Sequence, residues 1–157
     1  MHAPVLIKTR NKLFRCMRSF RCKSHRGFAP EPRRAGGLAR WQIHRVIQYV
    51  ETNIGRESLQ TPRLANVAGL SPFHFIRMFR RSMGQSPQEF VTQRRIERSQ
   101  TLLLATNMRL AQIAADCGFS DQSHFIRQFR KCVGASPGAW RRNIATMSRY
   151  PELSGGR

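Results

Sequence analysis

HFIRMFRRSMGQSP, residues 74–87, is followed fifty residues later by HFIRQFRKCVGASP, residues 124–137. In both copies the aromatic residues recur at helical spacing, and arginines fall on the opposite side of that helix. Each copy then reaches a glycine and a Ser-Pro pair, which are typical of the end of one helix and the start of the next. The repeat therefore predicts two copies of one helical unit.

A shorter helix is predicted directly before the first copy. Thr61-Pro62 supplies an N-cap residue and a proline at the first helical position, and Gly69 ends this helix. Ser71-Pro72 repeats the signal and starts the next helix, which continues to about residue 83. A short helix, a tight glycine turn and a second helix together make a helix-turn-helix.

The second copy follows the same pattern with one more residue. Gly118 makes the turn, Phe119 enters the core, and Ser120 is expected to cap a helix from Asp121 to about Cys132. Because the extra residue precedes the repeated phrase, we expect the second helix to begin one position earlier relative to its body. The chain thus contains two predicted helix-turn-helix units.

A long helix is predicted between the two units. Ser86 and Pro87 supply the cap and the first helical position, and Glu89 completes a capping box three residues after the serine. This helix can run to about Ala105, which at 1.5 Å per residue gives roughly 25–30 Å. One turn of B-DNA is roughly 34 Å, so such a helix can hold two recognition helices in successive major grooves.

The body of the chain shows helical periods and no strand alternation, so we expect an all-α fold. A first helix is predicted at residues 39–53, with Trp41, Val46, Ile47 and Val50 inward. The expected divisions are a basic N-terminal arm at 1–38, a first helix-turn-helix subdomain at 39–85, a linker helix at 86–106, a second helix-turn-helix subdomain at 107–145 and a tail at 146–157.

Charge is the strongest feature of the composition. The 157 residues include 28 Lys and Arg against 8 Asp and Glu, which leaves a formal net charge of +20. So much unpaired cation favours a polyanionic partner, of which nucleic acid is the commonest. Residues 1–39 hold ten of the cations and one acid, Glu31. We interpret them as a disordered arm or the cut end of a longer relative, with a basic amphipathic helix as the alternative.

Cysteine spacing argues against a metal centre. Cys16, Cys22, Cys117 and Cys132 match neither the CxxC pairs of zinc sites nor a dense disulfide framework, so reduced thiols are expected. No apolar run approaches the roughly 18 residues that span a bilayer. We therefore expect a soluble, cytoplasmic protein with no metal, no cofactor and no catalytic residues.

The face opposite the aromatic core carries the candidate DNA contacts. Arg77 and Arg127 stand at the same place in the two copies, and arginine bonds guanine bidentately, so they are the strongest base-reading candidates. Phe73 and Ile76 also point outward, where they contact a base or pack on a neighbouring element. The outward residues expected in the second copy are Gln122, Ser123, Ile126, Arg127 and Arg130.

Other polar residues are candidates for phosphate contact. His74 and His124 occupy equivalent places in separate units, so a structural or phosphate-binding role is favoured over a metal or acid–base pair. Helix N-termini at Thr61-Pro62 and Asn107 can add phosphate-binding amides. The cationic candidates, which follow the reading positions or lie on the linker helix, are Arg80, Arg81, Arg94, Arg95, Arg130 and Lys131.

The run IAADCGFSDQSHFIRQFRKCVGASPGAWRR, residues 113–142, closely resembles the signature of the AraC/XylS family of bacterial transcription regulators. Upstream, LANVAGLSPFHFIRMFRRSMGQSP and RRIERSQTLLL are similar to the family's first helix-turn-helix and linker helix. The resemblance covers about residues 40–143 and implies a seven-helix, two-lobed domain that reads an asymmetric DNA site and usually activates transcription through RNA polymerase. By similarity, the reading positions are Phe73, Ile76, Arg77, Gln122, Ser123, His124 and Arg127.

Two residues depart from the family pattern. Ile76 replaces a residue that is often polar, which puts base reading by the first lobe in question, and Trp140 stands where tyrosine is frequent. Many relatives also carry a ligand-sensing or dimerisation domain, which the 39 residues of the basic N-terminal segment cannot form. We therefore expect a stand-alone or truncated member, associated with the bacterial nucleoid and without an effector domain.

The charge has a second explanation, because a non-specific nucleoid-type or RNA-binding basic protein would carry it equally well. The capped, glycine-turned and duplicated helices favour sequence-specific binding to double-stranded DNA. An enzyme has little support, although some relatives fuse this domain to DNA-repair chemistry. The ratio of affinities separates the two binding hypotheses, because a sequence-specific protein should bind its own site about 10³-fold or more tighter than random duplex.

Overall fold

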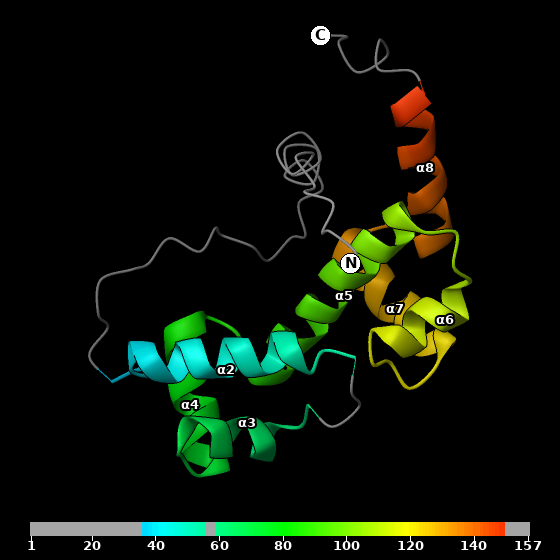
Figure 1. The fold of residues 1–157 in the computed structure, drawn as a ribbon. Coiled ribbons are helices and arrows are strands. Elements are labelled where there is room, and N and C mark those ends of the chain that lie inside the picture. Colours follow the sequence, from blue (N-terminus) through cyan, green and yellow to red (C-terminus); the bar gives the residue numbers. More distant parts are fainter. Residues whose placement is uncertain (1–35, 56–58, 150–157) are drawn as a thin grey trace, which may run out of the picture.

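The computed structural model describes residues 36–55 and 59–149, and all of the regular structure in these ranges is α-helical (Figure 1). This confirms the all-α prediction. None of the described helices has the length and apolar character needed to cross a membrane. The seven helices are α2 (Arg40–Thr52), α3 (Thr61–Ala68), α4 (Pro72–Met83), α5 (Pro87–Ala105), α6 (Leu110–Asp116), α7 (Gln122–Val133) and α8 (Pro137–Arg149).

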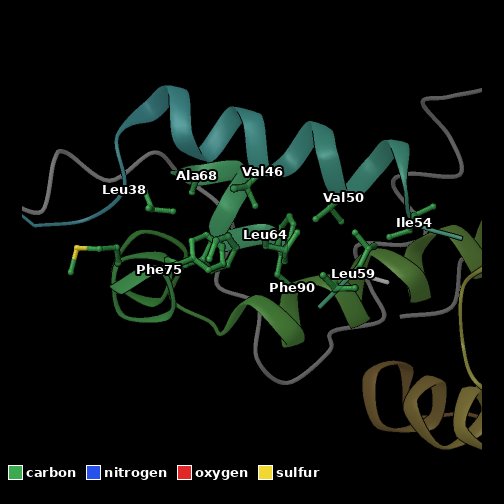
Figure 2. Packing of buried hydrophobic residues seen from close by; sticks show 13 residues of the cluster. Leu38, Val46, Val50, Ile54, Leu59, Leu64, Ala68, Phe75 and Phe90 are labelled. Atoms are coloured by element: carbon green, nitrogen blue, oxygen red, sulfur yellow. The ribbon is translucent and has the colours of Figure 1, made fainter. Parts of the chain in front are cut away.

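We call α2, α3, α4 and the N-terminal half of α5 the first lobe. Val46 and Val50 of α2 lie with Leu64 of α3 and Phe75 of α4 in one buried cluster (Figure 2). The ring of Phe79 lies 5.3 Å from that of Phe75, which extends the cluster along α4. Each of these fully buried apolar side chains contributes about 1.5–3 kcal/mol. The cluster therefore fixes one face of α4 and leaves the other to solvent.

The first lobe begins before the predicted boundary at residue 39. Leu38 is buried in the first-lobe cluster, and its backbone N–H donates to Ser82 Oγ over 2.7 Å. Just before it, the carbonyl oxygen of Gly36 accepts from Arg81 Nη1 over 3.5 Å. Residues 36–38 therefore pack with α4, and the rest of the predicted arm lies outside the described residues.

We call α6, α7, α8 and the C-terminal half of α5 the second lobe. Phe119, Phe125, Phe129 and Trp140 form a row of rings whose neighbouring centroids are 5.2, 5.7 and 5.8 Å apart. Such aromatic pairs add about 0.5–1.5 kcal/mol each to the effect of burial. Trp140 anchors α8 in this row, and α8 continues to Arg149, so the tail predicted to begin at residue 146 starts inside a helix.

The linker helix α5 joins the two lobes (Figure 1). Its predicted capping box is confirmed: Ser86 Oγ accepts from the backbone N–H of Glu89, and Glu89 Oε2 accepts from the backbone N–H of Ser86 over 2.8 Å. Phe90 of its first half is buried in the first-lobe cluster, and Leu103 of its second half in the second-lobe cluster. Its 19 residues span about 28 Å at 1.5 Å per residue.

Two predicted N-caps are wrong by one position. The N-cap of α3 is Gln60, so Thr61 is already helical. The N-cap of α7 is Asp121, whose carboxylate accepts from the backbone N–H of His124 over 2.6 Å. Ser120 bonds to this carboxylate over 3.0 Å. The carboxylate takes the cap because a negative charge is stabilised at a helix N-terminus more than a neutral hydroxyl is.

The extra residue of the second copy lies in the turn, and the prediction that the second helix begins one position earlier is wrong. Both α4 and α7 contain 12 residues and begin two residues before the repeated histidine. The turn glycine stands two residues before the N-cap in the first copy, Gly69 to Ser71, and three before it in the second, Gly118 to Asp121. Phe119 fills this longer turn and is buried.

Trp41 does not face inward as predicted, since 56% of it is exposed. The buried residues of α2 are Val46 and Val50. Trp41 precedes Val46 by five residues, so at about 100° per residue it lies roughly 140° round the helix from the buried stripe. Its ring faces the guanidinium of Arg45 at 6.0 Å instead.

Candidate nucleic-acid interface

The exposed face of α4 carries the reading candidates of the first lobe. Phe73 is 90% exposed and Ile76 is 38% exposed, although both are apolar. Arg77 is exposed beside them. The opposite face holds the buried Phe75 and Phe79. An exposed apolar pair next to an exposed arginine is suited to a partner with both methyl groups and hydrogen-bond acceptors.

The exposed face of α7 is similar but more polar. Gln122, Ser123 and Arg127 are exposed near its N-terminus. Ile126, predicted to point outward, is half-buried because its side chain packs against the second-lobe cluster. Ser123, Ile126 and Arg127 line an open hollow together with Arg130. The structure thus brings the candidates Ser123, Arg127 and Arg130 together on one surface.

The two repeated histidines have different surroundings. His74 is exposed. His124 is half-buried, with its ring edge-on to Phe119 at 5.7 Å between centroids. Its Nδ1 lies 3.2 Å from Ser120 Oγ, and its Nε2 lies 3.4 Å from Gln128 Nε2. The structure therefore places His124 against the turn of the second unit, with both ring nitrogens in contact with protein.

Four cationic candidates are exposed in the last turns of the recognition helices. They are two pairs at equivalent positions, Arg80 and Arg81 in α4, and Arg130 and Lys131 in α7. Cations at these places also complement the negative end of the helix dipole. Their arrangement puts positive charge about one turn beyond each reading arginine, where a duplex backbone would pass.

The remaining two cationic candidates contact protein. Arg94 Nη1 lies 2.9 Å from Glu97 Oε2, and its Nη2 lies 3.6 Å from Glu51 Oε1. The guanidinium of Arg95 lies over the ring of Phe119 at 5.9 Å. Both side chains are half-buried in the middle of α5. These protein contacts distinguish Arg94 and Arg95 from the four exposed cations of α4 and α7.

The predicted phosphate-binding helix start at Asn107 is wrong. Helix α6 begins at Leu110, with Arg109 as its N-cap, and it contains seven residues. Asn107 lies in the segment between α5 and α6, where α8 holds the carbonyl oxygen of Met108 and also reaches one near the end of α5. Arg141 of α8 donates to the carbonyl oxygen of Met108 over 3.0 Å and to that of Leu103 over 3.3 Å.

The two cysteines in the described part of the chain are packed in or against the second-lobe core. Cys117 is fully buried in the second-lobe cluster, and Cys132 is half-buried against it. Burial raises the pKa of the Cys117 thiol to about 11, because the thiolate would lose its hydration. The thiol stays protonated near neutral pH and acts as a small apolar side chain. Cys16 and Cys22 lie outside the described residues.

A family model described as a helix-turn-helix domain matches residues 64–143, which is just over half of the chain. The HTH-type transcriptional activator Btr of Bacillus subtilis is 32% identical over 80 residues, covering 51% of this chain and 15% of Btr. The uncharacterized HTH-type transcriptional regulator YbfP of the same organism is 31% identical over 112 residues, covering 71% of this chain and 38% of YbfP. The chain spans well under half the length of either relative.

Solved structures have the same fold. The C-terminal domain of AraT, a response regulator from Geobacillus stearothermophilus, gives a TM-score of 0.63 at 29% identity and covers 68% of this chain and 87% of that one. The DNA-binding domain of the global transcriptional factor AdpA, solved with a target DNA, gives a TM-score of 0.63 at 26% identity and covers 71% of this chain and 97% of that one. With the family match and the paired helix-turn-helix units, these likenesses show that the chain belongs to the AraC-type family of DNA-binding transcription regulators.

Proposed function

We propose that the chain is a sequence-specific regulator of transcription that inserts α4 and α7 into successive major grooves of double-stranded DNA. The observation that carries the proposal is the pair Arg77 and Arg127, which are exposed at equivalent positions of two equal helices. The 19 residues of α5 separate these helices by a rigid element of about 28 Å, close to the roughly 34 Å of one DNA turn.

Base reading is assigned to the exposed N-terminal turns of the two helices. Arg77 and Arg127 bond guanine, and Gln122 bonds adenine, because each side chain matches the edge of that base in the major groove. Phe73 and Ile76 contact thymine methyl groups, since they are exposed and apolar. Ser123 and His124 complete the reading positions of the second lobe, with His124 contributing through its exposed part.

Phosphate binding is assigned to the cations one turn further along. Arg80 and Arg81 follow the reading face of α4, and Arg130 and Lys131 follow that of α7. His74, which is exposed in the first turn of α4, joins them. Such contacts position a protein on the duplex without reading sequence, and they make its affinity depend on salt.

The chain is proposed to act as an activator that contacts RNA polymerase on the bacterial nucleoid, in the cytoplasm. The relative Btr is named a transcriptional activator, and two Pseudomonas putida relatives are named activators of the XylDLEGF operon. The basic arm at 1–38, most of which lies outside the described residues, is proposed to add electrostatic affinity. No catalytic step is assigned to any residue.

The test is selection of bound duplexes from a random DNA pool. We expect a consensus with two parts about one helical turn apart, because α5, about 28 Å long, joins the lobes that carry α4 and α7. The affinity for the selected duplex should exceed that for random duplex by about 10³ or more at 150 mM salt. The same assay with a matched single-stranded RNA serves as the comparison for the RNA-binding alternative.

Equal affinity for selected and random duplexes would instead make the chain a non-specific nucleoid-type protein. Tighter binding to RNA than to duplex DNA would overturn the assignment to transcription sites.

A further inference from the structure

The two lobes touch at a second place besides α5. The chain leaves α2 on the side of the first lobe nearest the second lobe (Figure 1). There, a Cβ atom on Gly55 would lie 2.6 Å from the carbonyl oxygen of Asp116, at the end of α6. A Cβ atom on Gly118 would lie 2.8 Å from the carbonyl oxygen of Ile54. Cβ atoms essentially never come within 3.0 Å of a heavy atom beyond their own residue and its chain neighbours, so only glycine allows the two backbones this approach.

The two glycines are needed for different reasons. Gly55 has no left-handed φ, so its backbone conformation is open to any residue and only the space excludes a side chain. Gly118 has φ +75°, close to the +69° of Gly69 at the equivalent turn of the first lobe. A Cβ atom on Gly69 would meet nothing within 4 Å. The turn of the second lobe therefore carries a spatial constraint that the turn of the first lobe lacks.

Charged groups surround the same contact. Arg94 lies between Glu97 on its own helix and Glu51, the next-to-last residue of α2. The guanidinium of Arg95 reaches to 2.9 Å from the Cβ position of Gly118 and covers the ring of Phe119. The middle of α5 is thus connected by side chains to the end of α2 on one side and to the turn of the second lobe on the other.

We propose that Gly55 and Gly118 are specificity-determining positioning residues, because their contact sets the orientation of α7 relative to α4. This inference rests on the function proposed above. A single helix fixes the distance between the lobes but leaves its own bend and twist to be determined. A second contact away from the helix axis removes that freedom. Recognition groups must be held within about 0.5 Å and 10–20° of their working geometry, which a lone linker helix does not ensure.

The test compares two pairs of variants. Gly118→Ala and Gly69→Ala introduce the same strain at a left-handed φ, but only the first places a methyl group against the other lobe. Gly55→Ala adds a methyl group at the contact without strain. Gly138→Ala is its control, because a Cβ atom there would lie 3.7 Å from Arg142 Nη1, which is an ordinary contact.

The readout is the spacing profile of DNA binding, measured on the selected duplex with zero to five base pairs inserted between its two parts. The wild-type chain should prefer one spacing steeply. In Gly55→Ala and Gly118→Ala the ratio of the best to the next-best spacing should fall by about tenfold, the typical cost of one misfitted base pair. Gly69→Ala and Gly138→Ala should keep the wild-type profile, even where Gly69→Ala lowers overall affinity.

A DNA-free measurement separates the inference from the function on which it rests. Residual dipolar couplings of the free chain should fit one alignment tensor for both lobes in the wild type and two in Gly55→Ala. If the wild type selects no sequence, the proposed function fails. The number of alignment tensors still shows whether the inter-lobe contact fixes the orientation of the lobes. A single tensor and an unchanged spacing profile in Gly55→Ala would overturn the inference. The inference would also be overturned if Gly69→Ala and Gly118→Ala broadened the spacing profile equally. This second comparison tests the inter-lobe contact even if Gly55→Ala does not fold.

Discussion

Arg127 and Lys131 lie one helical turn apart on α7, and both are exposed. We expect Arg127 to read bases and Lys131 to contact phosphate, because Arg127 lies nearer the N-terminal turns of the helix and Lys131 lies in its last turn. Arg127→Ala should cost roughly 1–3 kcal/mol on the selected duplex and relax the preference at one or two base pairs. Lys131→Ala should weaken binding to all duplexes alike and lower the salt slope by about one unit.

Titration of both variants against selected and random duplexes at several salt concentrations checks this prediction. The helical circular dichroism signal and melting temperature must match those of the wild type, since a lost fold imitates a lost contact. Weak binding by Arg127→Ala with the full sequence preference retained would identify Arg127 as a phosphate contact and refute its assignment to base reading.

Asp121 should stabilise the second lobe in a pH-dependent way. The backbone N–H of His124, followed by the hydroxyl of Ser120, lowers the pKa of the Asp121 carboxyl below its ordinary value of 3.8. Its stabilising charge is therefore fully present above pH 3.8 and is lost as the pH falls through the lower folded-state value. Asp121→Asn keeps a capping side chain but does not titrate, so its stability should fall less than that of the wild type between pH 6 and pH 3.

Urea unfolding at the two pH values measures the difference. Ser71→Ala is the matched control, because the N-cap Ser71 of α4 makes no side-chain cap bond, and it should change stability little at either pH. An equal loss of stability in wild type and Asp121→Asn on acidification would show that other carboxyls carry the effect.

At the scale of single residues, the sequence predicts which face of a helix is buried but not what covers the other. The repeated aromatic spacing correctly places Phe75 and Phe129 in the cores. The same reasoning fails for Ile126, because a neighbouring part of the lobe covers a position that the helical period leaves outside. It also misses Gly55, whose need for space arises from a residue 61 positions away in sequence.

At the scale of elements, α5 is the clearest success of the sequence. Its start and its end at Ala105 agree with the prediction, because the capping box is a local signal that needs no tertiary partner. The predicted cap at Thr61 is wrong because α3 begins one residue earlier, after Gln60, which makes no side-chain cap bond and so leaves no local signal. The predicted cap at Ser120 is wrong because two adjacent residues could each serve as the cap. In the second case the carboxylate of Asp121 competes better than the hydroxyl beside it.

The capping box gives a prediction for the linker helix. Ser86→Ala removes the hydroxyl that accepts from the backbone N–H of Glu89, and it should cost about 1 kcal/mol in the free energy of unfolding. DNA spacing preference should stay unchanged, since α5 remains docked through Phe90 and Leu103 on its two halves. Urea unfolding and the spacing profile are the two measurements.

A shifted spacing preference in Ser86→Ala would show that the first turn of α5 controls the placement of the lobes. That result would contradict the view that the buried residues along the whole helix do so.

At the scale of the molecule, the net charge and the repeated units predict different properties. The net charge of +20 predicts a polyanionic partner and is silent about topology. The duplicated units predict the two lobes, and the structure adds how they meet, at Gly55 and Gly118, and how Arg94 and Arg95 line that junction. The sequence suggested phosphate contacts for these two arginines. It could not show that the fold brings a glutamate close to one and an aromatic ring close to the other.

The basic arm should change how tightly the chain binds DNA but not which sequence it prefers. Residues 1–35 hold ten Lys and Arg and one acid, whereas the reading candidates all lie on α4 and α7. Deleting 1–35 keeps Gly36 and Leu38, which bond to and pack on the first lobe, so the fold should be retained. The slope of log K against log salt should become shallower by about 0.9 for each arm cation that neutralises a phosphate.

Replacing the ten arm cations with glutamine at full chain length separates charge from chain length, and it should reproduce the shallower slope. Selection from a random pool should return the wild-type consensus with both variants, because neither alters a recognition helix. A consensus that lost base pairs beside the part contacted by α4 would mean that the arm reads bases itself. The position of Gly36 against Arg81, in the last turn of α4, would then place that reading next to the first lobe.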